Sequence, residues 1–183
     1  MSAILRRSKV RGEPRVLIKL LSAAGLVTLC LTLSLQATKA GDALRGMPRV
    51  IDGNTIELAG QRLRLHGIDA PELGQVCELR GKPYDCGEIS RAALLDLTAG
   101  TPILCRPIES ESGTAYCFAD DYDLSSGMVY TGWALADREV TDRYVETEAG
   151  ARDGKRGLWR GRFVAPWDWR AGERLDLETA TAQ

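Results

Sequence analysis

The chain has 183 residues, of which 44% are hydrophobic and 27% are charged. This balance is typical of a globular protein, and it excludes collagen-like, low-complexity and largely disordered chains. The length is sufficient for one domain with additional segments, and the sequence contains no internal repeat.

Residues 1–40 have the three parts of a secretory signal peptide. Six basic residues precede an apolar run from Leu20 to Leu35, and small residues follow it. We therefore expect cleavage after Ala37 or Ala40 and an exported protein, either periplasmic or secreted, with no stable membrane span after cleavage. The alternative is an uncleaved signal anchor, although the apolar run is shorter than the ~20 residues that a stable span needs.

Removal of the signal peptide would make the remaining chain acidic. Residues 1–40 contain seven Lys and Arg and one Glu, so 17 basic and 24 acidic residues remain, a net charge of −7. Nucleic-acid-binding surfaces usually carry a basic footprint. Any binding of nucleic acid by the exported chain would therefore depend on a local pocket.

Four of the five cysteines lie outside the signal peptide: Cys77, Cys86, Cys105 and Cys117. An even number of cysteines in an exported chain indicates disulfides, and four cysteines allow three pairings. The simplest pairing is Cys77–Cys86 with Cys105–Cys117, in which each short loop would add ~2–3 kcal/mol of stability. A zinc site is the alternative, but the chain has no C-x-x-C pair and only one histidine, His66.

Short strands separated by turns open the predicted domain. We expect strands at residues 49–51, 55–58 and 62–67. The intervening turns contain Gly and Asn, which tolerate positive φ. In the third strand Leu63 and Leu65 share one face, whereas Arg62, Arg64 and His66 share the other. Arg64 therefore points away from the apolar face.

Helices and further strands follow. Helical spacing and stop signals predict helices at residues 87–100, 124–130 and 144–156. A loop with Cys77 and Cys86 is expected before the first helix, and Asp123 can cap the second. Strands are expected at residues 102–107 and 114–119, with an extended segment at 133–136. This order predicts an α+β fold, an OB-fold five-stranded barrel with three helices. The domain would cover residues 41–170, followed by a polar, frayed tail at 171–183.

The residues themselves resemble a known family. The stretch VIDGNTIELAGQRLRLHGIDAPE, residues 50–72, resembles the first half of the staphylococcal nuclease (thermonuclease) domain. GWALA, the helix ending in GKRGLW and the closing PWDW resemble the second half, as seen in exported bacterial members. The resemblance covers about residues 47–170. It implies a calcium-dependent phosphodiesterase that cleaves DNA and RNA.

The resemblance also implies a metal site. The D-x-PE aspartate, a calcium ligand in the family, is Asp69 here, and the adjacent ligating carbonyl is that of Ala70. The aspartates of the family's DGDT turn fall on Asp52 and Asn54. The amide at position 54 keeps the turn shape but removes one negative charge, so we expect weakened Ca²⁺ binding.

The resemblance assigns the catalytic roles to Glu72, as general base, and Arg64, which binds the phosphate. A second arginine should come from the link at residues 109–113, near Ser112 or Gly113, but this link reads ESESG. A comparable charge-stabilising arginine is worth roughly 10³–10⁵ in rate in phosphoryl-transfer enzymes. We therefore expect a site with a single guanidinium and weak or lost nuclease activity.

Three functions remain open. The first is a degenerate thermonuclease-like domain that binds single-stranded nucleic acid or a nucleotide phosphate. The second is an active Ca²⁺-dependent endonuclease that recruits another arginine, with Arg106 and Arg143 as candidates. The third is a structural or protein-binding exported domain. His66 is expected to be solvated, and the tryptophans of the C-terminal part are expected to serve packing: Trp159, Trp167 and Trp169.

Overall fold

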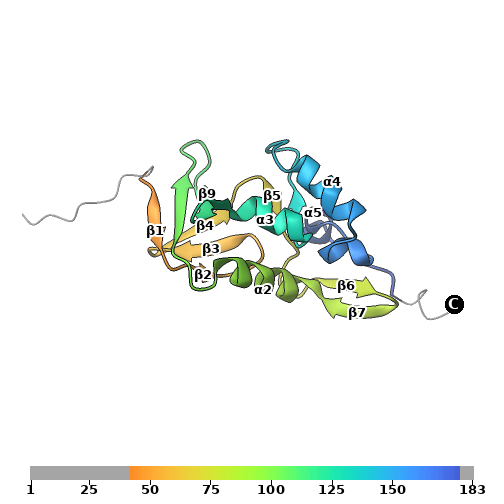
Figure 1. Cartoon of the computed structure of the whole chain (residues 1–183). Coiled ribbons are helices and arrows are strands. Elements are labelled where there is room, and N and C mark those ends of the chain that lie inside the picture. The colour runs from red at the N-terminus through yellow and green to blue at the C-terminus, as the bar shows by residue number, and fades with distance from the viewer. Residues whose placement is uncertain (1–41, 178–183) are drawn as a thin grey trace, which may run out of the picture. The chain divides into compact units, whose positions relative to one another are not determined.

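The alternation of apolar and polar residues in the first half of the domain produces a strongly curled sheet (Figure 1). The computed structural model describes residues 42–177, and the predicted signal peptide lies outside them. The strands of the main sheet are β1 (Leu44–Gly46), β2 (Arg49–Val50), β3 (Thr55–Leu58), β4 (Gln61–Leu65), β8 (Ile103–Pro107), β9 (Thr114–Ala119) and β10 (Tyr122–Asp123).

The sheet order is β1-β8-β9-β4-β3-β2, with β10 paired to β9. All neighbours are antiparallel except β4 and β9, where Arg64 lies opposite Thr114. Two smaller sheets pair β5 (Ile68–Asp69) with β11 (Leu135–Ala136), and β6 (Val76–Leu79) with β7 (Lys82–Asp85). This mixed α+β architecture confirms the predicted OB-fold class.

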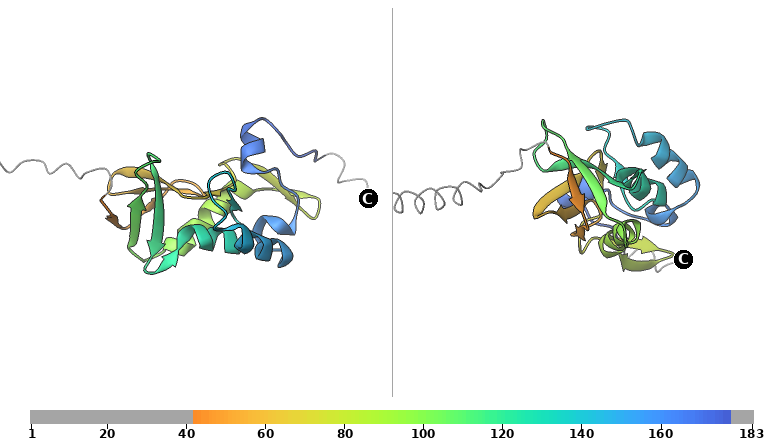
Figure 2. Two further views of the ribbon diagram at one scale, coloured as in Figure 1. Left: turned by 90° about the horizontal axis from the view of Figure 1, so that it is seen from above. Right: turned by 60° about the vertical axis from the view of Figure 1, so that its left-hand side comes forward.

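The described chain contains four α-helices and one 3₁₀-helix: α2 (Cys86–Thr98), α3 (Leu124–Thr131), α4 (Val145–Asp153), α5 (Pro166–Arg170) and η1 (Gly157–Arg160). The first three correspond to the predicted helices. In the left view of Figure 2 the orange and green strands of the main sheet lie at one end, and the blue helices lie toward the other.

Helix positions follow from local signals in the sequence. The side chain of Asp85 accepts a hydrogen bond from the Glu88 N–H, and Asp123 caps α3 in the same way, as predicted. Helix α3 ends at Gly132, which has the left-handed conformation (φ 78°) that a glycine adopts without strain. A side chain there would also collide with the backbone of Arg156.

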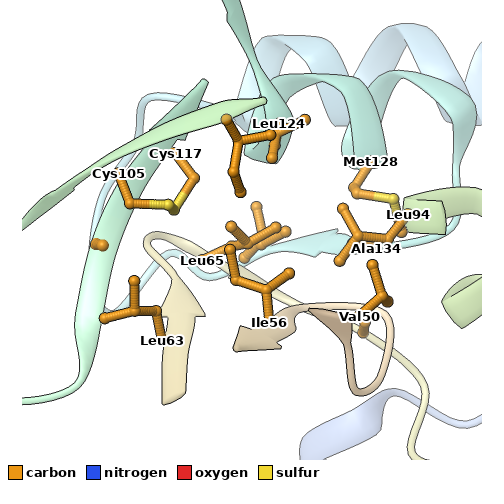
Figure 3. Packing of buried hydrophobic residues seen from close by; sticks show 14 of the residues in the cluster. Val50, Ile56, Leu63, Leu65, Leu94, Cys105, Cys117, Leu124, Met128 and Ala134 are labelled. Carbon is orange, nitrogen blue, oxygen red and sulfur yellow. A yellow bond between two sulfur atoms is a disulfide. The ribbon is translucent and has the colours of Figure 1, made fainter. Parts of the chain in front are cut away.

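The core lies between the inner face of the sheet and helices α2 and α3 (Figure 3). Leu63 and Leu65 of β4 point into it, whereas Arg62 and Arg64 are exposed, as the alternation predicts. Apolar residues of both helices complete the core: Leu94, Leu124 and Met128. The face of β4 that carries Arg64 is therefore left for other contacts.

Both predicted disulfides are present. Cys105 and Cys117 lie opposite each other on β8 and β9, and their disulfide is fully buried in the core. Cys77 of β6 is bonded to Cys86, the first residue of α2. The second disulfide joins the β6–β7 hairpin to the start of a helix, a region that the sequence predicted to be a loop.

We expect replacement of Cys105 and Cys117 by alanine to lower the free energy of unfolding by about 2–3 kcal/mol, because the unfolded chain loses the closed loop. Urea unfolding of the variant and of the unchanged protein measures this difference. The Cys77→Ala/Cys86→Ala variant is the matched control for a loop of similar length. Equal stability of the Cys105→Ala/Cys117→Ala variant and the unchanged protein would contradict the prediction.

Candidate functional site

The turn between β2 and β3 brings Asn54 to the end of β4. The Asn54 N–H donates to Asp52 Oδ1 (3.0 Å), and the Asn54 carbonyl accepts from the Leu65 N–H (2.8 Å). Glycine is required at position 53, since a Cβ there would lie 1.9 Å from Ser90 Oγ of α2. The turn is thus fixed between the sheet and α2, and the Asn54 side chain is buried.

Asp69 is the centre of the site. It lies on β5 opposite Leu135 of β11 and is only 2% exposed. Its Oδ1 accepts hydrogen bonds from Arg64 (2.7 Å) and from the Asn54 amide nitrogen (3.2 Å). The structure therefore brings together three of the residues that the sequence assigned to the site.

A second guanidinium also contacts Asp69, contrary to our prediction of a single arginine. Arg170, the last residue of α5, donates to Asp69 Oδ2 (2.6 Å) and Oδ1 (3.2 Å), and to Glu72 Oε1 (2.7 Å). The hydrogen bonds to Asp69 raise the pKa of Arg170; burial opposes this shift and Glu72 adds to it. Two carboxylates and two guanidinium groups thus form one cluster.

Sequence reasoning missed Arg170 because this residue lies at the boundary between the predicted domain and the frayed tail, where no helix was predicted. The segment PWDWR instead forms a short helix, in which Pro166 occupies the first turn and is buried. A proline in this position followed by polar and aromatic residues is a helix-start signal that could have predicted α5.

Gln75 connects the loop of Glu72 to the segment that precedes α5. This fully buried side chain accepts from the Glu72 N–H (3.1 Å) and donates to the Val164 carbonyl (2.8 Å). Its own N–H donates to the Glu72 carbonyl (2.8 Å). The positions of Glu72 and Arg170 are therefore linked through one amide side chain.

The β6–β7 hairpin gives α5 a second attachment. Glu78 and Arg162 exchange two backbone hydrogen bonds of 2.9 Å and form an ion pair of 2.8 Å. The helix that follows the hairpin approaches Glu72 closely, because a Cβ at Gly87 would lie 1.9 Å from the Glu72 carbonyl oxygen. The hairpin and α2 therefore determine where the acidic loop and the C-terminal segment meet.

The link at residues 109–113 lies beside Arg64, as the resemblance implies, since the Arg64 N–H donates to the Gly113 carbonyl (2.7 Å). In place of an arginine, this link carries Glu111, which contacts His66 Nδ1 at 3.3 Å. His66 is buried, with its ring 4.5 Å from that of Tyr116. Our expectation of a solvated His66 was wrong, because the link and β9 cover this face of β4.

The two arginines proposed as replacements contact other residues. The Arg106 guanidinium lies over the Phe118 ring (5.3 Å), and Arg143 is paired with Asp123 (3.2 Å). Arg170 therefore supplies the second guanidinium of the site, and Arg106 and Arg143 do not.

The remaining predicted metal ligands do not form a cation site with Asp69. Asp52 accepts from the Asn54 backbone and lies 3.8 Å from Arg62, and Ala70 is a buried residue after β5. Within residues 42–177, no group of three or more His, Cys, Asp or Glu side chains is placed to hold a metal ion. The described donors do not fit the calcium site that the resemblance implies.

A pocket of ≈ 760 Å³ lies next to the cluster and is bordered by both Asp69 and Arg170. The pocket is also lined by Arg152, whose guanidinium lies 4.3 Å from the Trp159 ring centre. Trp167 of α5, which was expected to serve packing, also lines the pocket and is 43% exposed, so only part of its side chain is packed. The lining therefore combines cationic, acidic and aromatic side chains, since Asp137, Glu139 and Glu148 belong to it as well.

Comparison with known proteins places this fold in one class. The sequence matches no protein-family model. It is 35% identical over 131 residues to "Succinoglycan biosynthesis protein ExoI" of Rhizobium meliloti (strain 1021), with 67% of this chain and 68% of that protein covered. It is 32% identical over 122 residues to "Probable staphylococcal-like nuclease CAN2" of Oryza sativa subsp. japonica, with 62% of this chain and 30% of that protein covered.

A second rice protein, "Probable staphylococcal-like nuclease CAN1", is 28% identical over 149 residues, with 76% of this chain and 41% of that protein covered. The chain therefore spans less than half the length of these plant relatives. The curled sheet with its helices and the D-x-PE site define a nuclease-like OB-fold domain. The chain belongs to the staphylococcal nuclease-like family.

We expect Gln75→Ala to lower the free energy of unfolding by about 1–3 kcal/mol, because the Glu72 N–H and the Val164 carbonyl lose their buried partner. The amides of α5 should also exchange faster with solvent. Urea unfolding and hydrogen exchange measure the two effects. Gln61→Ala is the control, since Gln61 is an exposed residue of β4; an equal loss in both variants would contradict the role assigned to Gln75.

Proposed function

We propose that this chain is a phosphodiester-binding domain that cleaves single-stranded nucleic acid far more slowly than a complete thermonuclease. The observation that carries this proposal is the convergence of Arg64 and Arg170 on Asp69 and Glu72. The side chains of the two arginines remain 49% and 41% exposed, so parts of both guanidinium groups are available to a ligand.

Two convergent guanidinium groups suit the recognition of a phosphate. Each presents planar donors that match phosphate oxygens, and together they would oppose the negative charge that grows during phosphodiester hydrolysis. The adjacent pocket supports binding of a strand, since exposed aromatic rings such as Trp167 stack on bases without sequence preference. A local site of this kind is compatible with the acidic charge of residues 41–183.

Three features support slow cleavage. Asn54 has no negative charge for a cation, and Glu111 occupies the link where the family's second arginine is expected. Glu72, the general base by resemblance, has its Oε1 bound to Arg170. Each of these changes acts on the same transition state, so their costs are not additive.

A second candidate function is that of an active endonuclease, and Arg170 is the observation that favours it. An arginine supplied by α5 could replace the one missing from the link, although it is at present bound to both carboxylates. A purely structural or protein-binding role is the third candidate. Binding and cleavage of nucleic acid distinguish all three.

We also propose that the protein is exported, to the periplasm or outside the cell, after cleavage at Ala37 or Ala40. The two disulfides support this, since such bonds persist in oxidising compartments. Within residues 42–177, no helix is long and apolar enough to cross a membrane. The N-terminal sequence of the protein recovered from culture medium and periplasm tests the cleavage site.

We expect the purified protein to cleave a single-stranded DNA oligonucleotide at least about 10³-fold more slowly than a complete thermonuclease, because Asn54 has no charge for a cation, the link has no arginine and Glu72 is bound to Arg170. Loss of one charge-stabilising group alone costs a phosphoryl-transfer enzyme about this much. Parallel reactions with Ca²⁺, Mg²⁺ and EDTA measure the rate. Rapid Ca²⁺-dependent cleavage that disappears in Glu72→Gln would instead establish the active endonuclease.

We expect Arg64→Gln to weaken oligonucleotide binding about tenfold or more, as loss of a charged hydrogen bond to phosphate does. Arg62→Gln is the matched control, because Arg62 lies on the same face of β4 and is more exposed than Arg64. Fluorescence anisotropy measures both affinities. No binding by the unchanged protein would leave the structural or protein-binding role.

A further inference from the structure

Both carboxylate oxygens of Asp69, the central ligand that a divalent cation would need, are already hydrogen-bonded. Both carboxylate oxygens of Asp69 accept from Arg170, and Oδ1 also accepts from Arg64. Glu72 Oε1 accepts from the same Arg170. A hard cation such as Ca²⁺ requires several free oxygen ligands, so it could bind here only by displacing the Arg170 guanidinium.

The side chain at position 54 is turned the wrong way for a metal ligand. Asn54 directs its amide nitrogen, a hydrogen-bond donor, at Asp69 Oδ1 (3.2 Å) and at the Ile68 carbonyl (3.4 Å). An aspartate at this position would repel Asp69 unless a cation lay between them. The amide of Asn54 is therefore compatible with a site in which Arg170, in place of a cation, pairs with Asp69.

The charges of the cluster balance without a metal. Asp69 and Glu72 contribute two negative charges, and Arg64 and Arg170 contribute two positive charges. A divalent cation bound beside Asp69 would be repelled by the two nearby guanidinium groups. Because Asp69 is only 2% exposed, solvent would screen this repulsion weakly.

Arg170 is held in place by contacts remote from its guanidinium. The segment before α5 is bonded to Gln75 through the Val164 carbonyl, and to Glu78 through Arg162. Pro166 at the start of α5 is buried. These contacts keep the guanidinium at the carboxylates, in contrast to that of Arg174, which bonds to carbonyls of its own segment.

We propose that the Arg170 guanidinium takes the place of a divalent cation in this site, so that the protein binds the phosphates of single-stranded nucleic acid without a metal ion. The part of this inference that concerns nucleic acid depends on the function proposed above. The part that concerns the cation does not, since metal binding is measured with no nucleic acid present.

The first experiment titrates the purified protein with Ca²⁺ by calorimetry up to about 1 mM, the weak end of protein calcium sites. We expect no binding by the unchanged protein and measurable binding by the Asn54→Asp/Arg170→Gln variant, in which one charge is added and the guanidinium is removed. Binding of Ca²⁺ by the unchanged protein would overturn the inference. Absence of binding in both proteins would also contradict it, because the guanidinium would then not fill a place that suits a cation.

The second experiment measures affinity for a single-stranded DNA oligonucleotide by fluorescence anisotropy, in EDTA and in Ca²⁺. We expect less than about a twofold difference between the two conditions, and a loss of about tenfold to a hundredfold in Arg170→Gln. Arg174→Gln is the matched control and should bind like the unchanged protein. A requirement for Ca²⁺, or equal affinity of Arg170→Gln and the unchanged protein, would refute the proposal.

Circular dichroism shows whether the Arg170→Gln variant is folded. If it is not, Arg170→Lys replaces it in the comparison with the unchanged protein. Lysine keeps the charge but lacks the planar fork, so we expect intermediate oligonucleotide affinity and no Ca²⁺ binding. Affinity of Arg170→Lys equal to that of the unchanged protein would show that the fork of Arg170 does not contact the phosphate.

Discussion

The buried carboxylate of Asp69 is the constraint on which the rest of the site depends. A charged carboxylate removed from water is strongly unfavourable unless it is paired and hydrogen-bonded. Here the pairing comes from Arg64 of β4, Asn54 of the preceding turn and Arg170 of α5. The curled sheet, the turn at Gly53 and the C-terminal helix therefore have to be assembled together for the buried Asp69 to have its hydrogen-bond partners.

The sequence predicted the parts of the structure that depend on local patterns. The alternation along β4 correctly separated Leu63 and Leu65 from Arg64, and Asp123 was correctly assigned as the cap of α3. The disulfides followed from short cysteine separations. In each case the physical cause lies within a few residues of the feature, so a reading of the chain in order is sufficient.

The parts that were missed depend on contacts between distant residues. Arg170 and Asp69 are 101 positions apart, and no local pattern marks an arginine after two tryptophans as a partner for a carboxylate. The β6–β7 hairpin contains Pro83, which weakens its strand signal, and it is stabilised by Arg162 from the other end of the domain. His66 was misjudged for the same reason, because the residues that cover it come from the link and from β9.

The attachment of the C-terminal segment to Gln75 and Glu78 affects how the domain folds and how much of the chain it needs. Arg170 is 101 positions from Asp69 and 98 from Glu72, and together with Arg64 these residues form one charge-balanced cluster. Formation of the cluster therefore requires closure of a long loop, and such distant contacts raise the contact order of the fold. A chain that lacked its last helix would retain the sheet but leave two neighbouring acids with one basic partner. Helix α5 therefore completes the charge balance of the cluster, although none of its residues belongs to the main hydrophobic core.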